Sequence, residues 1–480
     1  MKYFYLLLFV ILSNFSNAQD TIRVNIFPKS NANFLQIFQQ ALNEKKGSVL
    51  KITVNKGNYL LNERLFTSRN NTFLNFEKGA VLNFTDNGKS GIIVAHDYFT
   101  IKNATIKGNG KPSADFYNGY GILLNGASYA KIINNTFQEL GGNNILLYPT
   151  SNGKSSSNNL ISNNNFSKPA SPNTLGGDQS AIMLGYSGEN YSHDNNIIEN
   201  NIIDGNNQLN IGIAILGHGN HNIIRNNTIS NVLSYGILAY ESKVVGNTLD
   251  SLKVIDNTIK NVGEINAIKT VRGMGIYLMT ATNAQVSGNK VSNVLRNNNE
   301  SETLGAGAIS LSLSPGAKVY DNVINGSYMY GIVSDYSFGS KFYNNEIFNT
   351  RRSGLYLINV NDVEVYNNTF SNIGGVVFRG YFENSSLAYI KEQLRDEKYK
   401  NIDTGNNISI TNNKINSNQE ILYFNSTSPD KSKNYKGNIM KNITFTNNEV
   451  SGNTKPIQEL VNFRGGLGRN LKVKSNRTLR

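Results

Sequence analysis

The sequence predicts an all-β fold: a single-stranded parallel β-helix of about a dozen coils, with an N-terminal capping helix and an Asn ladder. Three observations predict it. An Asn returns at one position of each repeat, short apolar strands alternate with these asparagines, and the chain has no cysteine. Without disulfides, burial and hydrogen bonding must hold the coils together.

The Asn pattern consists of an apolar residue, two spacers, the Asn, one spacer and a second apolar residue. Its tightest spacing, 23 residues between "KVYDNVI" (318–324) and "KFYNNEI" (341–347), suits a coil of three short strands and three turns. An Asn at the same turn of every coil can hydrogen-bond the Asn of the next coil, which predicts a ladder of buried amides. The ladder residues are Asn135, Asn201, Asn227, Asn257, Asn322, Asn345, Asn368, Asn413 and Asn448, with Asn164, Asn289 and Asn476 as weaker members.

The strands between these asparagines follow a "GIxL" pattern, as in "IGIAILG" (211–217) and "MGIYLMT" (274–280). Because side chains alternate along a strand, the third and fifth positions of this pattern are expected to face outward. The predicted outward residues include tyrosines, serines, an Asp and an Arg, and such a polar and aromatic face suits sugar rings. They are Asn125, Tyr148, Gly185, Leu216, Tyr240, Met279, Ser312, Asp335, Ile358 and Arg379 at the fifth position, and Tyr277, Ser310 and Tyr356 at the third.

The two ends of the chain carry other signals. Residues 1–18 resemble a secretory signal peptide cleaved near Ala18, which predicts a secreted, periplasmic or cell-surface protein. Residues 19–50 are expected to form a cap, with an amphipathic helix within 31–46. Residues 51–480 are assigned to the β-helix, with a helical loop insertion near 384–402. Within 243–260, Asn247 and Asn257 compete for one ladder position.

The charge balance favours a polyanionic partner, because 46 Lys and Arg face 33 Asp and Glu for a net charge of +13. The basic residues are spread along the chain without the dense patch of a nucleic-acid binder. We therefore expect an anionic polysaccharide as partner and no nucleic acid. No stretch reaches the roughly 20 apolar residues of a membrane helix, so no membrane span is predicted. We expect the protein to be a monomer.

On the Asn ladder, the "GIxL" strands and "VNKGNYLL" (54–61), the chain resembles the right-handed parallel β-helix proteins of the pectate-lyase-like superfamily over roughly residues 50–480. The superfamily includes polysaccharide lyases, glycoside hydrolases, esterases, epimerases and adhesins, so these motifs are specific for fold and not for activity. The resemblance implies an extended groove along one sheet, here that of the "GIxL" strands.

Two groups in this superfamily suggest particular residues. Alginate and dermatan lyases of this fold pair a Lys base with an Arg near acidic residues that hold calcium. Glu264 and Lys269 resemble that spacing, although they precede the strand "MGIYL" (274–278) and do not lie on it. Calcium is the one cofactor that this resemblance implies. Gly217-His218-Gly219 resembles part of the polygalacturonase motif set, but the other parts do not follow at fitting spacings.

Three of the four histidines, His193, His218 and His221, fall in the same predicted turn of neighbouring coils. Clustered imidazoles can act as a base, bind an anionic sugar substituent or hold a metal, and the plain alternative is that they fill a polar turn. We expect His218 to act as a base and the other two to contact substrate. The sequence does not indicate a particular set of metal ligands.

Three functions remain open. A lyase acting by β-elimination needs a base and a cation for the uronate carboxylate, and the basic composition favours it. A hydrolase needs two carboxylates about 5–9 Å apart, such as Glu241 with Asp335 or Asp178 with Glu189. A non-catalytic polysaccharide-binding β-helix would share the groove alone. The predicted catalytic residues are His218, Tyr240, Lys269, Arg272, Glu241 and Asp335, and the predicted substrate-binding residues are His193, His221, Tyr277, Arg351, Arg352, Tyr356 and Arg379.

Overall fold

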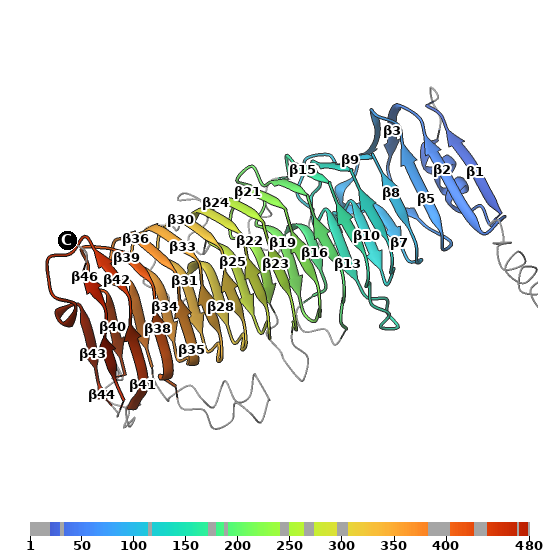
Figure 1. The fold of residues 1–480 in the computed structure, drawn as a ribbon. Coiled ribbons are helices and arrows are strands. Elements are labelled where there is room, and N and C mark those ends of the chain that lie inside the picture. Colours follow the sequence, from blue (N-terminus) through green and yellow to red (C-terminus); the bar gives the residue numbers. More distant parts are fainter. Residues whose placement is uncertain are drawn as a thin grey trace, which may run out of the picture.

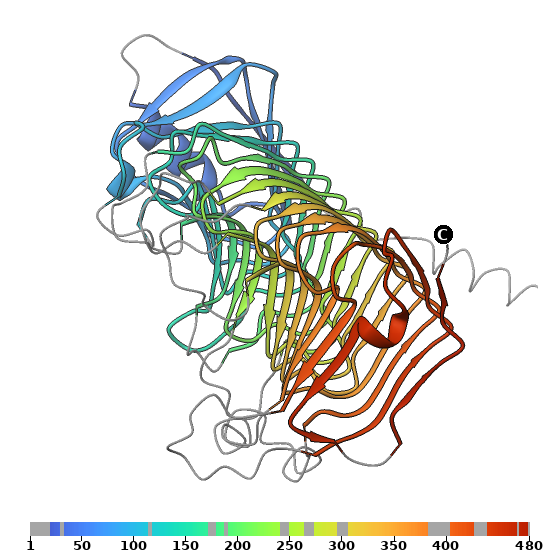
Figure 2. The same ribbon diagram turned by 90° about the vertical axis from the view of Figure 1, so that its left-hand side faces the viewer.

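A computed structural model describes residues 20–28, 33–113, 118–170, 179–186, 191–240, 249–263, 273–294, 306–382, 404–426, 439–467 and 470–478. In it the chain winds into an elongated rod whose coils follow one another in sequence order from the N-terminal to the C-terminal end (Figure 1). Three parallel sheets form the walls of the rod, and each coil between the two ends contributes one strand to each sheet. The view toward the C-terminal end shows the stacked coils enclosing a single bore (Figure 2).

Sheet A has 17 strands, and most are three to six residues long. They are β1 (Thr21–Ile26), β2 (Val49–Val54), β5 (Thr72–Phe76), β8 (Thr100–Lys102), β11 (Lys131–Ile133), β14 (Leu160–Ser162), β17 (Ile197–Glu199), β20 (Ile223–Arg225), β23 (Lys253–Ile255), β26 (Gln285–Ser287), β29 (Lys318–Tyr320), β32 (Lys341–Tyr343), β35 (Asn361–Tyr366), β38 (Asn406–Thr411), β41 (Ile439–Thr446), β44 (Gly466–Leu467) and β45 (Lys472–Lys474).

Sheet B has 15 strands and follows sheet A in each coil. They are β3 (Gly57–Leu61), β6 (Ala80–Phe84), β9 (Thr105–Lys107), β12 (Thr136–Gln138), β15 (Asn165–Ser167), β18 (Ile202–Asp204), β21 (Thr228–Val232), β24 (Thr258–Val262), β27 (Lys290–Val294), β30 (Val323–Ser327), β33 (Glu346–Thr350), β36 (Thr369–Ile373), β39 (Lys414–Asn416), β42 (Glu449–Ser451) and β46 (Arg477–Thr478).

Sheet C has 14 strands and contains the predicted "GIxL" strands. They are β4 (Leu65–Phe66), β7 (Ile92–Val94), β10 (Ile122–Asn125), β13 (Ile145–Tyr148), β16 (Ser180–Leu184), β19 (Ile211–Leu216), β22 (Tyr235–Tyr240), β25 (Met274–Met279), β28 (Gly307–Ser312), β31 (Tyr330–Asp335), β34 (Ser353–Ile358), β37 (Phe378–Tyr381), β40 (Leu422–Asn425) and β43 (Val461–Arg464).

The bore is filled by aliphatic and aromatic side chains from all three sheets, which form one continuous buried core along the rod. In sheet C, Ile237, Ile276 and Ile309 occupy one register position on successive strands and point into this core. The repeat thus buries its apolar residues against identical neighbours above and below, and so a short strand of three residues suffices in each coil.

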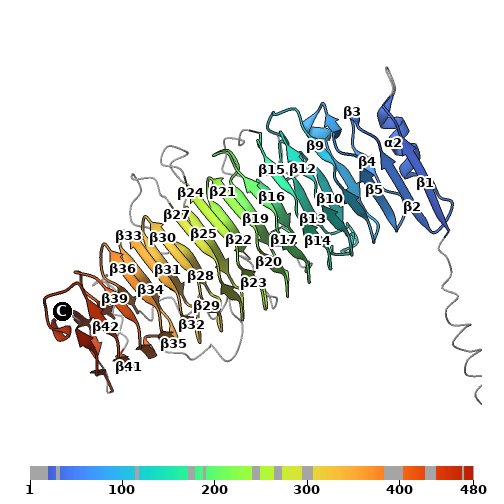
Figure 3. The same ribbon diagram turned by 45° about the horizontal axis from the view of Figure 1, so that its top comes forward.

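The N-terminal end of the bore is covered by helix α2 (Phe34–Leu42), as the amphipathic pattern predicts, over a shorter span than 31–46 (Figure 3). Phe34 and Phe38 pack edge-on against Tyr59 of the first full coil, with ring centroids 5.0 and 5.4 Å apart. Asn33 caps the helix, its side chain accepting a hydrogen bond from the Gln36 N–H at 3.2 Å. Two 3₁₀ turns, η1 (Asn87–Lys89) and η3 (Ile457–Glu459), complete the described helices, none of which is long and apolar enough to span a membrane.

The Asn ladder is confirmed between sheets A and B, from Asn135 to Asn476. Each rung is the same. The backbone N–H of Asn201 and its Nδ2 both donate to Oδ1 of Asn227, at 3.0 and 2.9 Å, and Nδ2 also donates to the carbonyl of Ile161. Asn257 takes the rung in its coil, which settles the register left ambiguous within 243–260. Every buried amide of the turn is satisfied by its neighbours.

The doubled "NN" of the repeat also has an explanation. The residue before each rung adopts the left-handed conformation, as at Asn200 (φ 56°), Asn226 (φ 56°) and Asn344 (φ 56°). Asn tolerates this region better than other residues with a Cβ, because its short polar side chain compensates locally. The first Asn therefore turns the chain and the second bonds the next coil.

Several predicted features lie outside the described residues. They are the signal peptide at 1–18, the insertion near 384–402, and the candidate residues Asp178, Glu189, Glu241, Glu264, Lys269 and Arg272.

Candidate functional site

The outer face of sheet C carries the residues that the alternation predicted to face outward. Tyr277, Ser310 and Tyr356 share one register row with Leu238, Val333 and Arg379, and a second row contains Tyr240, Met279, Ser312, Asp335, Ile358 and Tyr381. Arg379 therefore lies in the third-position row, a correction to the fifth position predicted for it. The cause is that β37 begins with an inward-facing Phe378, directly after the turn.

Asp335 is the most unusual group on this face. It ends strand β31, and its Oδ1 is buried without a hydrogen-bond partner among the described residues, although the residue as a whole keeps some solvent access. Burial raises the pKa of the Asp335 carboxyl to about 7, and a hydrogen bond with the Ser312 side chain opposes this only in part. At neutral pH the group therefore exchanges between its acid and its carboxylate forms, which is the condition for general acid–base catalysis.

Tyr277 lies beside this carboxyl and shares its partner. Burial raises the pKa of the Tyr277 phenol far above its ordinary value, the neighbouring Tyr235 and Asp335 add to the rise, and the Ser312 side chain opposes it. Ser312 thus contacts both Tyr277 and Asp335, and the three residues form a short polar network on adjacent strands. Tyr277 stays protonated across the physiological range and serves as a hydrogen-bond donor, not as a base.

Aromatic rings surround this network on the same face. The rings of Tyr235 and Tyr277 stack with centroids 6.0 Å apart, and Tyr240 packs against Met279 and Tyr277. On the other side, Tyr330 and Tyr356 lie with centroids 4.9 Å apart. Tyr330 and Tyr356 are buried, whereas Tyr235, Tyr240 and Tyr277 are partly exposed and provide ring surface of the kind on which sugar rings stack.

Two arginines lie at the edge of the aromatic residues. The guanidinium of Arg379 lies 5.4 Å from the ring centre of Tyr356, and that of Arg351 lies 4.5 Å from that of Tyr328. No carboxylate among the described residues forms an ion pair with either, since the ion pairs there all involve other residues. Arg352, next to Arg351, is half-buried at the start of strand β34. The structure thus brings Arg379, Tyr356, Tyr277 and Asp335 to one face, and Arg351 lies in the turn between β33 and β34, at the edge of that face.

The histidines do occupy one turn, between sheets C and A, but they do not form a reactive cluster. His193 and His218 are 0% and 3% exposed, on adjacent coils, and the His193 N–H donates to the His218 carbonyl at 3.0 Å. Burial lowers the pKa of His193 to about 4. His221 alone is exposed, with the left-handed φ of 56° that this turn needs.

The geometry therefore favours a structural role for His193 and His218 over the substrate contact and proton abstraction predicted for them. The ring Nδ1 of His193 accepts from the backbone N–H of Ser156 at 3.2 Å, and Asn222 of the next coil donates to the His193 carbonyl. These rings fill the turn. Beside them, a second and shorter Asn ladder runs through Asn159, Asn196 and Asn222. Their shared position follows from the periodicity of the repeat and not from a common role in a reaction.

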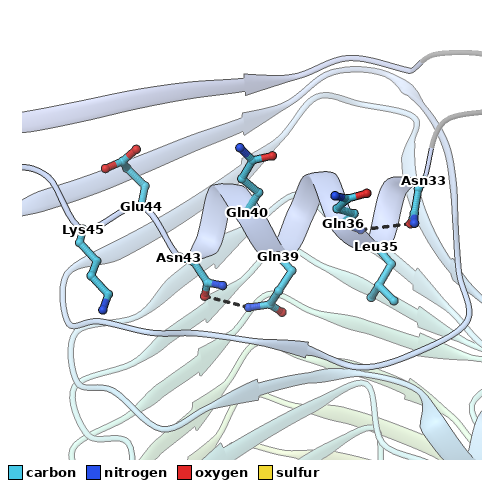
Figure 4. A pocket seen from close by; sticks show the side chains of 8 residues that line it. All are labelled: Asn33, Leu35, Gln36, Gln39, Gln40, Asn43, Glu44 and Lys45. Carbon is cyan, nitrogen blue, oxygen red and sulfur yellow. Dashed lines mark hydrogen bonds between the residues drawn. The ribbon is translucent and has the colours of Figure 1, made fainter.

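No group of three or more His, Asp or Glu in the described part of the chain is arranged to hold a metal ion. Calcium binding stays a prediction that rests on Glu264, outside these residues. A hollow of about 880 Å³ along helix α2 is unrelated to the face of sheet C (Figure 4). Its polar side chains belong to the cap, where Gln39 donates to Asn43 at 3.0 Å.

Sequence reasoning placed Asp335 among several equal candidates and missed Ser312 as its partner and Tyr328 as the support of Arg351. The register of sheet C is the signal that could have found Ser312, because Ser312 and Asp335 are direct neighbours on β28 and β31. Nothing in the sequence marks the desolvation of Asp335, which depends on residues from several coils.

Comparisons with known proteins agree with the fold. Residues 55–228, 90–294 and 224–393 match the family described as right handed beta helix region. No curated protein matches the chain. Among solved structures, PfbA, a surface adhesin of Streptococcus pneumoniae, is 16% identical with a TM-score of 0.51, covering 73% of this chain and 88% of that one.

The catalytic unit of a GH87 alpha-1,3-glucanase from Streptomyces thermodiastaticus is 14% identical with a TM-score of 0.53, covering 76% of this chain and 67% of that one. A PL6 family polysaccharide lyase from Pseudopedobacter saltans is 16% identical over 95% of this chain and 97% of that one, but its TM-score of 0.46 carries no argument. An adhesin and a glucanase share this fold, so any choice between functions depends on the residues of sheet C.

Proposed function

The chain belongs to the right-handed β-helix family, and from this premise we propose that it is a polysaccharide-processing enzyme whose groove is the outer face of sheet C. The observation that supports catalysis is Asp335, a buried carboxyl with a pKa raised to about 7 on a partly exposed aromatic face. A binding module gains nothing from such a group, whereas its desolvation costs folding free energy.

The proposed role of Asp335 is that of a proton donor to the glycosidic oxygen. Its raised pKa keeps much of it protonated near neutral pH, and Ser312 and Tyr277 hold the carboxyl in place. Sugar rings of the polymer stack on the partly exposed rings of Tyr235, Tyr240 and Tyr277. Export of the protein, as its first residues predict, would bring this face into contact with extracellular polysaccharide.

β-Elimination is the reaction we propose for this site. A base removes the proton on the carbon α to a uronate carboxylate, the electron pair forms a C=C bond, the glycosidic C–O bond breaks, and Asp335 protonates the leaving oxygen. The guanidinium groups of Arg379 and Arg351 favour a substrate that carries carboxylates. With His218 buried in its turn, Tyr240 and Lys269 remain as the other predicted bases, and Arg272 as a further predicted cation.

Glycoside hydrolysis is the second candidate, because a protonated carboxyl of raised pKa is also the acid that a hydrolase uses. The predicted pair of Glu241 with Asp335 is less favoured. Tyr240, the residue before Glu241, lies three strands from Asp335 in register, roughly 14 Å between backbones. Carboxyl pairs in glycosidases are about 5–9 Å apart.

The test is incubation of wild type and Asp335→Asn with a panel of uronate-containing, sulfated and neutral polysaccharides. We expect new ultraviolet absorbance from unsaturated ends with a uronate polymer, and a fall in kcat of roughly 10²- to 10⁴-fold in the variant. New reducing ends without absorbance would select the hydrolase. Retention of a polymer without cleavage would contradict catalysis and leave a binding protein.

The matched control is His218→Gln, which removes another of the predicted proton-transfer residues from the chain. Because His218 is buried in the turn, this variant should lose stability while the folded fraction keeps its kcat. A loss of kcat equal to that of Asp335→Asn, at full folding, would reverse the assignment.

A further inference from the structure

We propose that a hollow at the edge of sheet C is an anion subsite that binds the carboxylate or sulfate of a bound sugar. The hollow has a volume of about 380 Å³ and lies over the last residues of the sheet B strands β27, β30, β33 and β36 and the turns that lead from them into sheet C. Its lining includes Tyr328, Asn349, Arg351, Asn372 and Gly374. The inference rests on the proposed function, because it concerns one unit of the same saccharide.

The cation of this subsite is Arg351. Its side chain is exposed, and its guanidinium lies 4.5 Å from the ring centre of Tyr328, a contact that restricts the plane of the guanidinium. Arg225 differs, since it is paired with Glu199 at 2.6 Å. Within the described residues no carboxylate occupies the guanidinium of Arg351, so its fork of N–H donors is available to a planar anion.

Amide donors stand beside this cation. Nδ2 of Asn372 donates to Oδ1 of Asn349 at 2.5 Å, and Nδ2 of Asn349 donates to Oδ1 of Asn325 at 2.8 Å. These bonds fix the amides at the strand spacing along the hollow. Each NH₂ group carries a second proton that these bonds do not use, so the outer amide row presents further donors next to Arg351.

The subsite is continuous with the groove. Tyr328 packs in one cluster with Tyr330, Tyr356 and Tyr381 on the outer face of sheet C, and Arg379 lies over Tyr356 on that face. The turn is also tight, because a Cβ at Gly374 would lie 2.4 Å from the carbonyl oxygen of Arg351. A polymer on sheet C that runs past Asp335 can therefore place a charged substituent at this edge.

The experiment compares paired probes that differ only in charge: an oligogalacturonate and its methyl ester, and a sulfated galactan oligosaccharide and its desulfated form. Calorimetric titration measures their affinity for wild type, Arg351→Gln, Arg351→Lys and Lys318→Gln. The last variant removes one positive charge from the outer face of sheet A and controls for net charge.

We expect wild type to prefer the charged member of at least one pair. Arg351→Gln should lower the affinity for that probe about 10-fold or more and leave the affinity for its neutral partner unchanged. Arg351→Lys should have an intermediate affinity, because a lysine keeps the charge but lacks the two parallel N–H donors of a guanidinium. Lys318→Gln should change neither. Equal affinity of wild type and Arg351→Gln for the charged probe would overturn the subsite, while cleavage that depends on Asp335 would leave the proposed function standing. If no saccharide binds any variant and none is cleaved, both proposals fail.

Discussion

Polar groups are buried both in the turn that contains the Asn ladder and on the outer face of sheet C. The two regions differ in whether these groups have hydrogen-bond partners. In the ladder turn, each amide of Asn201 or Asn257 finds partners in the coils above and below. On sheet C, Oδ1 of Asp335 has no partner in the described structure, and its carboxyl is held near its point of titration. Satisfied polar groups stabilise a repeat, whereas an unsatisfied one costs stability and is retained for another reason.

His193 shows that rarity in the sequence is a poor guide to this difference. It is one of four histidines, yet it is buried, hydrogen-bonded through Nδ1 and kept neutral. It belongs with the ladder turn by its position and by the partner of its Nδ1, although its buried Nε2 has no partner among the described residues. Asp335, one of 33 acidic residues, belongs to the other class by its environment alone.

The largest expected effect on stability is that of removing a rung. Asn257→Ala deletes the oxygen that accepts from the N–H and the Nδ2 of Asn227, and the Nδ2 that donates to Ile224 and Asn289. Several buried groups lose partners, so the free energy of unfolding should fall by about 4 kcal/mol, as measured by urea unfolding followed by circular dichroism. Asn58→Ala, at an exposed position of β3, should change it by less than about 0.5 kcal/mol. A rung variant as stable as this control would refute the ladder's role.

The next largest effect should be the loss of folding stability that His193 causes when the pH is lowered. Its folded pKa of about 4 lies below the unfolded value of 6.5, so the unfolded state binds more protons between these values. Its contribution is complete above pH 6.5 and is lost as the pH falls toward 4, by roughly 3 kcal/mol in total. The measurement is the urea midpoint between pH 7.5 and 4.5. His193→Asn should flatten this part of the slope, and His221→Asn, at an exposed position, should leave it as in wild type.

The ionisation of Asp335 should make stability change with pH in the opposite direction. Its folded pKa of about 7 lies above its ordinary value of 3.8, so the folded state holds the proton longer and stability falls as the pH rises from 4 to 7. Asp335→Asn should therefore be more stable than wild type at pH 8.5, by roughly 2 kcal/mol after allowance for the partial solvent access of the residue. Thermal unfolding should show the gain at pH 8.5 and almost none at pH 4. A variant less stable than wild type at both pH values would mean that the carboxylate has a partner.

How far the sequence predicts the molecule follows from the same distinction. The coil, the ladder and most of the outward rows of sheet C depend on residues a fixed interval apart, so they can be predicted from spacing. Two near-copies in the repeat left Asn247 and Asn257 undecided, and the hydrogen bonds of the folded coils make Asn257 the rung. The desolvation of Asp335 and the burial of His218 depend on how several coils pack around one side chain. Spacing placed both residues correctly along the chain and could not say which of them water reaches.

The smallest expected effect concerns the outer face of sheet A and sharpens the choice of groove. Tyr320, Tyr343 and Tyr366 stack there with centroids 4.8 and 5.0 Å apart and nearly parallel rings, so both faces of the Tyr343 ring are covered by its neighbours. Tyr343→Ala should cost about 1 kcal/mol of stability through the lost stacking, and Tyr343→Phe much less. Saccharide retention should be unchanged in both variants, because a sugar cannot stack on a ring whose faces are occupied. If affinity electrophoresis showed that Tyr343→Ala releases the polymer while Tyr356→Phe retains it, the binding face would be sheet A, and the tyrosines beside Asp335 would be packing groups like the ladder.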